Sequence, residues 1–147
     1  MNRTQHTFRA GIVIGCLVAL VTSTGCSNTP TTPSAVSFSQ SDIRAGSGTE
    51  ATAGKTLTVN YTGWLYDASK PDQKGLIFDT NTGEAAFSFT LGAGQVIPGW
   101  DQGLVGLRVG GVRKLVIPSS LAYGGVRRAT IPPYSTLVFE VELLDVQ

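Results

Sequence analysis

Histidine and cysteine are almost absent from this sequence. Its 147 residues include one histidine, His6, and two cysteines, Cys16 and Cys26. A Ser-His-Asp triad, a Cys-His pair and a histidine-ligated metal site all need an imidazole. A disulfide scaffold or a cysteine-based zinc site needs more cysteines than two. These classes of enzyme and scaffold are therefore excluded if His6 and Cys16 belong to a segment that is removed.

The sequence also lacks an excess of charge of either sign. Eleven Lys and Arg stand against ten Asp and Glu, which gives a net charge of +1. Nucleic-acid binding calls for a clustered basic face, so we expect no nucleic-acid partner. The length predicts one domain, and a hydrophobic content of 41% is enough to build a core.

Residues 1–25 have the pattern of a secretory signal peptide. Two arginines and no acidic residue precede an apolar run over residues 10–21. This run is too short to span a bilayer, which takes about 20 apolar residues. We therefore expect export and removal of residues 1–25, and with them of His6 and Cys16. Nine basic and ten acidic side chains then remain.

Cys26 follows small residues, and the segment before it resembles a bacterial lipoprotein signal. That resemblance implies that Cys26 is acylated and becomes the first residue. Ser23 stands where the lipoprotein family usually has Leu or Val, and ordinary signal peptidase could cut the same bond. We expect a lipid anchor that faces the periplasm. The outer membrane is favoured over the inner because Ser27, rather than Asp, follows the cysteine.

Residues 26–37 are short and polar with two prolines, which predicts a flexible tether. The domain then extends over residues 38–147. We predict four strands, because apolar and polar residues alternate in three stretches and residues 113–117 are an apolar run introduced by charges. They are residues 57–65, 87–91, 113–117 and 136–146. Residues 66–76 are predicted to form a polar loop between two strands.

One stretch predicts a helix, which begins near Pro98. Proline costs nothing in the first turn of a helix, and Trp100, Leu104 and Leu107 follow at helical spacing. The prediction is an α+β domain, in which a twisted antiparallel sheet of about five strands wraps around one short helix.

Many of the aromatic and branched side chains lie near turns. Aromatic residues at strand spacing usually fill a core, but an aromatic cleft with a few polar groups is also the usual composition of a ligand site. Composition alone leaves both interpretations open.

Five motifs in one order favour the ligand site. They are residues 59–63 (VNYTG), 78–79 (FD), 96–100 (VIPGW), 122–124 (AYG), and 131–133 (IPP) followed by 136–144 (TLVFEVELL). Together they resemble the FKBP-type peptidyl-prolyl cis-trans isomerases, over residues 38–147. The resemblance implies a half-barrel sheet around the helix, and a cleft that binds a proline-containing peptide.

The resemblance also implies roles for individual residues. Four are expected to be catalytic: Tyr61, Asp79, Trp100 and Tyr123. Trp100 should form the floor under the proline ring, Asp79 should supply an acidic group at the edge, and the Tyr123 hydroxyl should donate to a peptide carbonyl. The expected substrate-binding residues are Phe78, Phe87, Val96, Ile97, Ile131 and Phe139. Among these, Ile97 should donate its backbone N–H and Ile131 should belong to a flap.

The chemistry suits these side chains. Rotation about an X–Pro bond meets a barrier of about 18–20 kcal/mol because twisting destroys amide resonance. No covalent bond breaks, so the reaction needs no nucleophile, metal or cofactor. An apolar pocket favours the twisted amide, which has less charge separation than the planar one.

Three segments depart from the family pattern, and one of them is the loop over residues 66–76, which is longer than in minimal members. The family often has an arginine shortly after the Phe-Asp pair, where this chain has residues 82–84 (TGE). The flap often carries a histidine and a second isoleucine, where this chain has residues 126–130 (VRRAT). Arg127 and Arg128 are expected to lie on a solvated face, or else to bias binding toward acidic peptides.

The main hypothesis is an exported monomeric isomerase that accelerates the folding of envelope proteins. Its expected partners are proline-containing peptides, unfolded envelope proteins and rapamycin-like macrolides. One alternative is a proline-peptide-binding module or ATP-independent chaperone with little catalysis. Another is a small β-barrel lipoprotein that binds an apolar small molecule.

Overall fold

The computed structural model describes residues 35–147. The predicted signal peptide, the predicted acylation site at Cys26 and most of the predicted tether lie outside the described residues. Within residues 35–147, no helix is both long enough and apolar enough to cross a membrane.

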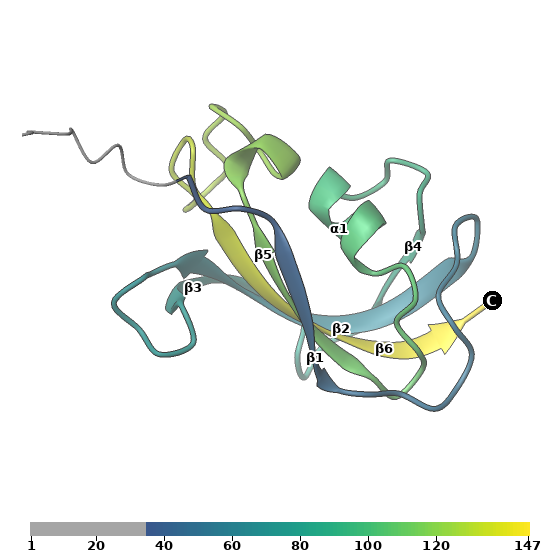
Figure 1. Cartoon of the computed structure of the whole chain (residues 1–147). Coiled ribbons are helices and arrows are strands. Elements are labelled where there is room, and N and C mark those ends of the chain that lie inside the picture. Colours follow the sequence, from purple (N-terminus) through teal and green to yellow (C-terminus); the bar gives the residue numbers. More distant parts are fainter. Residues whose placement is uncertain (1–34) are drawn as a thin grey trace, which may run out of the picture. The chain divides into compact units, whose positions relative to one another are not determined.

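Within residues 35–147, six strands form one antiparallel sheet, and one short helix packs on it (Figure 1). The strands are β1 (Ser39–Arg44), β2 (Thr56–Tyr66), β3 (Lys74–Thr80), β4 (Phe87–Thr90), β5 (Val112–Ile117) and β6 (Leu137–Val146). Their order is β1-β5-β6-β2-β3, and β4 pairs with β2 beside β3. The helix is α1 (Pro98–Gly103), and a single 3-10 turn, η1 (Ser119–Leu121), follows β5.

The predicted α+β architecture is confirmed, with two differences in the sheet. The sheet has one strand more than expected, because β1 pairs along β5 although all six of its side chains are exposed. An exposed strand has no buried face, so alternation cannot mark it. The predicted loop over residues 66–76 is too long: Tyr66 ends β2, and residues 74–76 already belong to β3, paired with β2.

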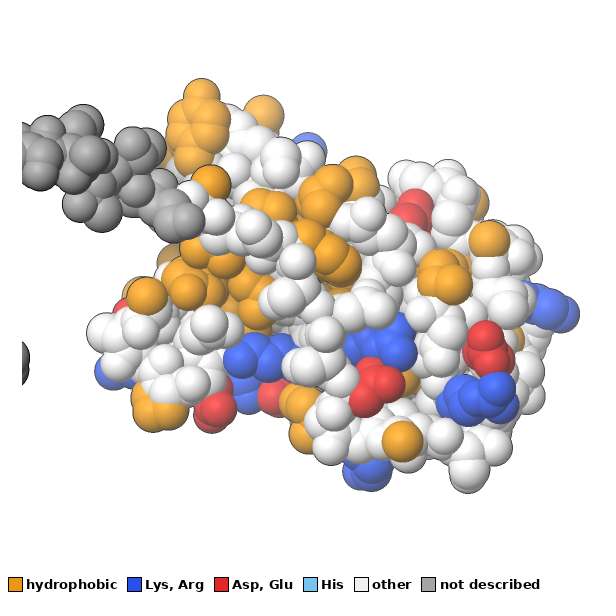
Figure 2. All heavy atoms as spheres, viewed as in Figure 1, with side chains coloured by type: hydrophobic (Ala, Val, Ile, Leu, Met, Phe, Trp, Pro, Cys, Tyr) orange, Lys and Arg blue, Asp and Glu red, His pale blue; other side chains and the backbone are white. Residues whose placement is uncertain are grey.

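The concave side of the sheet carries the core. The alternating residues of β2 and β6 are buried on this side, as their period of two predicts. The buried members are Leu57, Val59, Leu137, Phe139, Val141 and Leu143. Figure 2 shows hydrophobic side chains gathered on the upper part of one face, whereas paired charges lie below them.

The helix is held against the sheet by a glycine contact. Pro98 occupies the first turn, and Trp100, Leu104 and Leu107 are buried as their spacing predicts. A Cβ on Gly99 would overlap the Cγ2 atom of Ile117 on β5. Only glycine therefore allows α1 to approach β5 this closely, and that approach places the next residue, Trp100, over the sheet.

Candidate functional site

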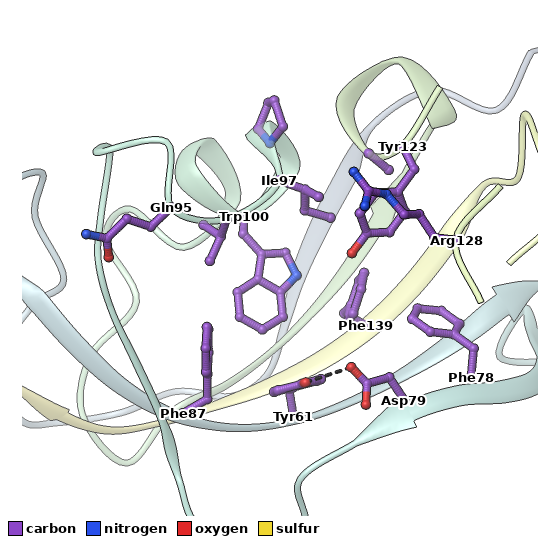
Figure 3. Close-up of a pocket in the computed structure, with 13 residues that line it drawn as sticks. Tyr61, Phe78, Asp79, Phe87, Gln95, Ile97, Trp100, Tyr123, Arg128 and Phe139 are labelled. Atoms are coloured by element: carbon purple, nitrogen blue, oxygen red, sulfur yellow. Dashed lines mark hydrogen bonds between the residues drawn. The ribbon is translucent and has the colours of Figure 1, made fainter. Parts of the chain in front are cut away.

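A cleft of about 460 Å³ opens between α1, the sheet and the segment after η1 (Figure 3). Thirteen residues line it: Tyr61, Phe78, Asp79, Phe87, Gln95, Val96, Ile97, Pro98, Trp100, Ala122, Tyr123, Arg128 and Phe139. They come from β2, β3, β4, α1, β6 and two connecting segments. Nine of the ten residues predicted for the site are among them.

Trp100 lies at the bottom of the cleft and is only 5% exposed. Its ring meets those of Tyr61 and Phe139 edge to face, at centroid distances of 5.2 and 5.3 Å. Its Nε1 is buried without a hydrogen-bond partner among the described residues. The indole is thus held by ring packing, which fixes its orientation.

Aromatic rings from four strands form the walls. Phe78 meets Phe139 edge to face at 5.4 Å, and Phe87 meets Tyr61 edge to face at 6.2 Å. Phe87 is 40% exposed, so part of its ring faces the open cleft. Gly63 on β2 leaves room for this packing, since a Cβ there would lie 2.6 Å from Phe78 and 2.8 Å from Phe139.

Tyr61 and Asp79 form the polar edge of the cleft (Figure 3). The Tyr61 hydroxyl donates to Oδ2 of Asp79 at 2.7 Å. No cation lies within ion-pair distance of Asp79 in residues 35–147. The hydrogen-bond partner of Asp79 is therefore the phenol of Tyr61, whereas the family often has an arginine shortly after this position.

Asn81 positions this edge, and no sequence motif marked it as a site residue. Its side chain is buried, accepts the Tyr61 N–H at 2.7 Å and donates to the carbonyls of Val59 and Ala85. An asparagine directly after a strand commonly makes such bonds to the backbone, but sequence alone does not show which strand receives them. Here the recipient is β2, so Asn81 fixes the strand that carries Tyr61.

Burial, and then the hydrogen bond and charge of Asp79, raise the pKa of Tyr61 well above its ordinary value. The folded state therefore keeps the phenol proton at a pH where the unfolded chain releases it, and stability falls as pH rises above about 10. Replacing Tyr61 by phenylalanine should cost about 0.5–1.5 kcal/mol at pH 8 and make this alkaline loss smaller. Urea unfolding of both proteins at pH 8 and pH 11 tests this; an equal alkaline loss in both would contradict it.

Tyr123 faces Tyr61 and Asp79 from the opposite side of the cleft (Figure 3). Its ring is half-buried, and burial raises the pKa of its hydroxyl, an effect that the positive charge of Arg128 opposes. The guanidinium Cζ of Arg128 lies 5.7 Å from the centre of the Tyr123 ring. Arg128 thus lines the cleft and is also exposed, in keeping with the solvated position expected for it.

Ile131 is the predicted site residue that does not line the cavity. Its side chain is 6% exposed and belongs to the core. Its backbone closes a tight turn, because Ile131 N–H donates to the Arg128 carbonyl at 2.7 Å and Arg128 N–H donates back at 3.2 Å. The side chain consequently points inward and anchors the flap; a contact with substrate stays a prediction.

Gln95, Pro98 and Ala122 also line the cleft and were not predicted as site residues. Pro98 was predicted as the start of the helix, and Ala122 only as part of a motif. Gln95 accepts the Thr90 N–H at 2.8 Å, which ties the end of β4 to the rim. Gln95 can be identified as a residue of the cleft only in the folded structure, where β4 and α1 lie close together.

One backbone donor and one side-chain donor lie in the cleft without a hydrogen-bond acceptor in the described part of the chain. They are the Ile97 N–H and the Tyr123 hydroxyl. Both residues line the same cavity as the indole of Trp100. An extended peptide with its carbonyls near these donors could therefore be held across the aromatic floor.

A family model and individual relatives indicate the same family of proteins. A family model described as FKBP-type peptidyl-prolyl cis-trans isomerase matches residues 47–144. The chain is 48% identical over 107 residues to an "FK506-binding protein" of Neisseria meningitidis, with 71% of this chain and 92% of that protein covered. It is 50% identical over 102 residues to "Peptidyl-prolyl cis-trans isomerase FKBP53" of Arabidopsis thaliana, covering 68% of this chain and 20% of that protein.

A solved structure has a similar fold. FkpA from Escherichia coli matches with a TM-score of 0.61 and 45% sequence identity. The match covers 75% of this chain and 48% of the FkpA chain, so this chain spans about half of that structure.

Proposed function

The chain belongs to the FKBP-type peptidyl-prolyl cis-trans isomerase family, and from this premise we propose that it rotates X–Pro bonds in the cleft over Trp100. The observation that carries the proposal is a pair of donors, the Ile97 N–H and the Tyr123 hydroxyl, that line the same cleft as the Trp100 ring and make no hydrogen bond within residues 35–147. In this arrangement a proline ring sits on Trp100 between the rings of Tyr61, Phe87 and Phe139.

The cleft would work by binding the twisted amide more tightly than either planar form. The twisted amide is less polar, so it loses less on leaving water, and the fixed rings can fit its shape. The two donors hold the flanking carbonyls while the bond turns. A millionfold acceleration requires roughly 8 kcal/mol of such differential binding, since each factor of ten takes about 1.36 kcal/mol.

The same cleft should accept FK506 and rapamycin-like macrolides. Relatives carry the name FK506-binding protein, and the aromatic walls offer an apolar surface of the kind that ring-shaped ligands fill. Arg128 on the flap is a difference that will change the affinity for such ligands.

A single assay tests catalysis and its site together. Cis-to-trans relaxation of Ala-Leu-Pro-Phe peptides should be faster with the purified protein, and FK506 should abolish the acceleration at a stoichiometry of one. A folded protein that binds the peptide without accelerating the relaxation would favour the alternative, a proline-peptide-binding module or chaperone.

We further propose that the protein is exported, is lipid-anchored through Cys26 and acts on folding envelope proteins. The order of charged, apolar and small residues before Cys26 supports export, and prolyl isomerisation is slow enough to limit folding outside the cytoplasm. Metabolic labelling with a radioactive fatty acid in a bacterial host should mark the chain. Cys26→Ser should remove the label and Cys16→Ser should not; a label that survives in Cys26→Ser would contradict the anchor.

A further inference from the structure

A positive charge without a partner stands at the mouth of the cleft. Arg44, Arg108 and Arg113 are each paired with a carboxylate. Within residues 35–147, the guanidinium of Arg128 makes neither an ion pair nor a hydrogen bond, although Arg128 lines the cavity. It lies beside the Tyr123 ring, on the side of the cleft away from Gln95 (Figure 3).

The backbone fixes where this charge is presented. Arg128 and Ile131 exchange two hydrogen bonds, and Ile131 is buried in the core. Ala129, between them, has a positive φ of 43°, a conformation found mainly in tight turns. A further bond from the Tyr134 N–H to the Gly124 carbonyl, 2.8 Å long, closes the base of the flap. Arg128 is therefore held at the cleft by a closed turn rather than by a free loop.

The carboxylates near the cleft do not form an ion pair with the guanidinium of Arg128. Asp79 also lines the cleft, but it accepts a hydrogen bond from Tyr61 on the opposite wall, and Glu84 acts on Tyr61 as well. At the Tyr123 hydroxyl the influence of Arg128 is larger than that of Asp79. A carboxylate beside the Tyr123 ring would therefore lie near the guanidinium of Arg128, whose Cζ is 5.7 Å from the centre of that ring.

We propose that Arg128 is a specificity-determining residue that favours peptides with Asp or Glu next to the proline. The inference rests on the proposed function, because it concerns peptides held across Trp100 with a carbonyl near Tyr123. A guanidinium offers a planar fork of donors that matches a carboxylate, and the ring of Tyr123 beneath it restricts its motion.

The test compares peptides that differ only in charge. Values of kcat/KM are measured for Ala-X-Pro-Phe and Ala-Pro-X-Phe peptides, with X as Glu or Gln, at low and high salt. The expected result is a preference of about two- to fivefold for Glu over Gln in at least one series, weakened by salt, as an exposed ion pair gives. Arg128→Gln should bring that ratio to one. Arg127→Gln is the matched control, because Arg127 is an exposed neighbour that does not line the cleft, and it should keep the ratio.

The outcomes separate this inference from the proposed function. Clear acceleration of the Gln peptides without a preference for Glu would overturn the role of Arg128 and leave the isomerase intact. A preference that persists in Arg128→Gln, or that is lost equally in Arg127→Gln, would also overturn it. No acceleration of any peptide by the folded protein would overturn the proposed function, and the inference with it.

Discussion

Replacing Trp100 by leucine should lower kcat/KM on X–Pro peptides by about ten- to a hundredfold. The indole forms the floor of the cleft and packs edge to face on Tyr61 and Phe139. A leucine offers less apolar surface to the proline ring, and a loss of about 1.4–2.8 kcal/mol of contact with the twisted proline corresponds to this range. The kcat/KM of Trp100→Leu is measured by peptide kinetics. The temperature is one at which circular dichroism shows that the variant is folded.

Trp64 provides the matched control. It lies on β2 outside the cleft, is partly buried, and has the ammonium of Lys74 4.6 Å from its ring centre. Trp64→Leu changes the same residue type and should leave kcat/KM within about twofold of the parent's, because it does not touch the peptide. A folded Trp100→Leu protein with the parent's kcat/KM, or an equal loss in Trp64→Leu, would contradict the role of Trp100.

Replacing Arg113 by methionine should reduce the free energy of unfolding by about 2–4 kcal/mol. Arg113 is 6% exposed, and its Nη1 donates to the carbonyls of Gly103 and Val105 at 2.9 Å each. Its Nε and Nη2 donate to Asp42 on β1. Without the guanidinium, the two carbonyls at the end of α1 and the carboxylate of Asp42 lose their partner, and β1 loses its link to the helix.

Urea unfolding monitored by tryptophan fluorescence measures this effect. Arg108→Met is the matched control, because the Arg108–Glu50 pair is half exposed on both sides and should contribute less than about 1 kcal/mol. The hydrogen bond and charge of Arg113 also lower the pKa of Asp42 below its ordinary value, so part of the parent's stability should vanish on acidification and be missing in Arg113→Met. Equal unfolding free energies for the two variants would contradict the account.

Periodicity and proline placement were enough to predict most of the sheet and the helix. Leu57, Val59 and the alternate residues of β6 are buried on one side, and such a pattern is visible without a structure. β1 was harder because its side chains are all exposed and its contribution is backbone pairing with β5. The start of β3 at Lys74 was hidden by polar and glycine residues that are typical of a loop.

The site was predictable where its residues sit in motifs. Nine of ten predicted residues line the cleft, and all nine belong to the five motifs or to the strand at residues 87–91. Asn81 and Arg128 were not assigned to it, since their roles depend on contacts between segments that are distant in the sequence or on the path of the flap. Ile131 shows the converse: its motif placed it on the flap, but the closed turn directs its side chain into the core.

The measurement that tests the central claim most directly is exchange NMR on an isotope-labelled Ala-Leu-Pro-Phe peptide in the presence of the unlabelled protein. This experiment observes rotation of the bond itself, and intermolecular nuclear Overhauser effects identify the rings beside the proline. The account predicts cis–trans exchange at a rate proportional to protein concentration, with contacts from the proline ring to Trp100 and Tyr61. Exchange at the uncatalysed rate with a folded protein, or contacts to residues outside the cleft, would contradict it.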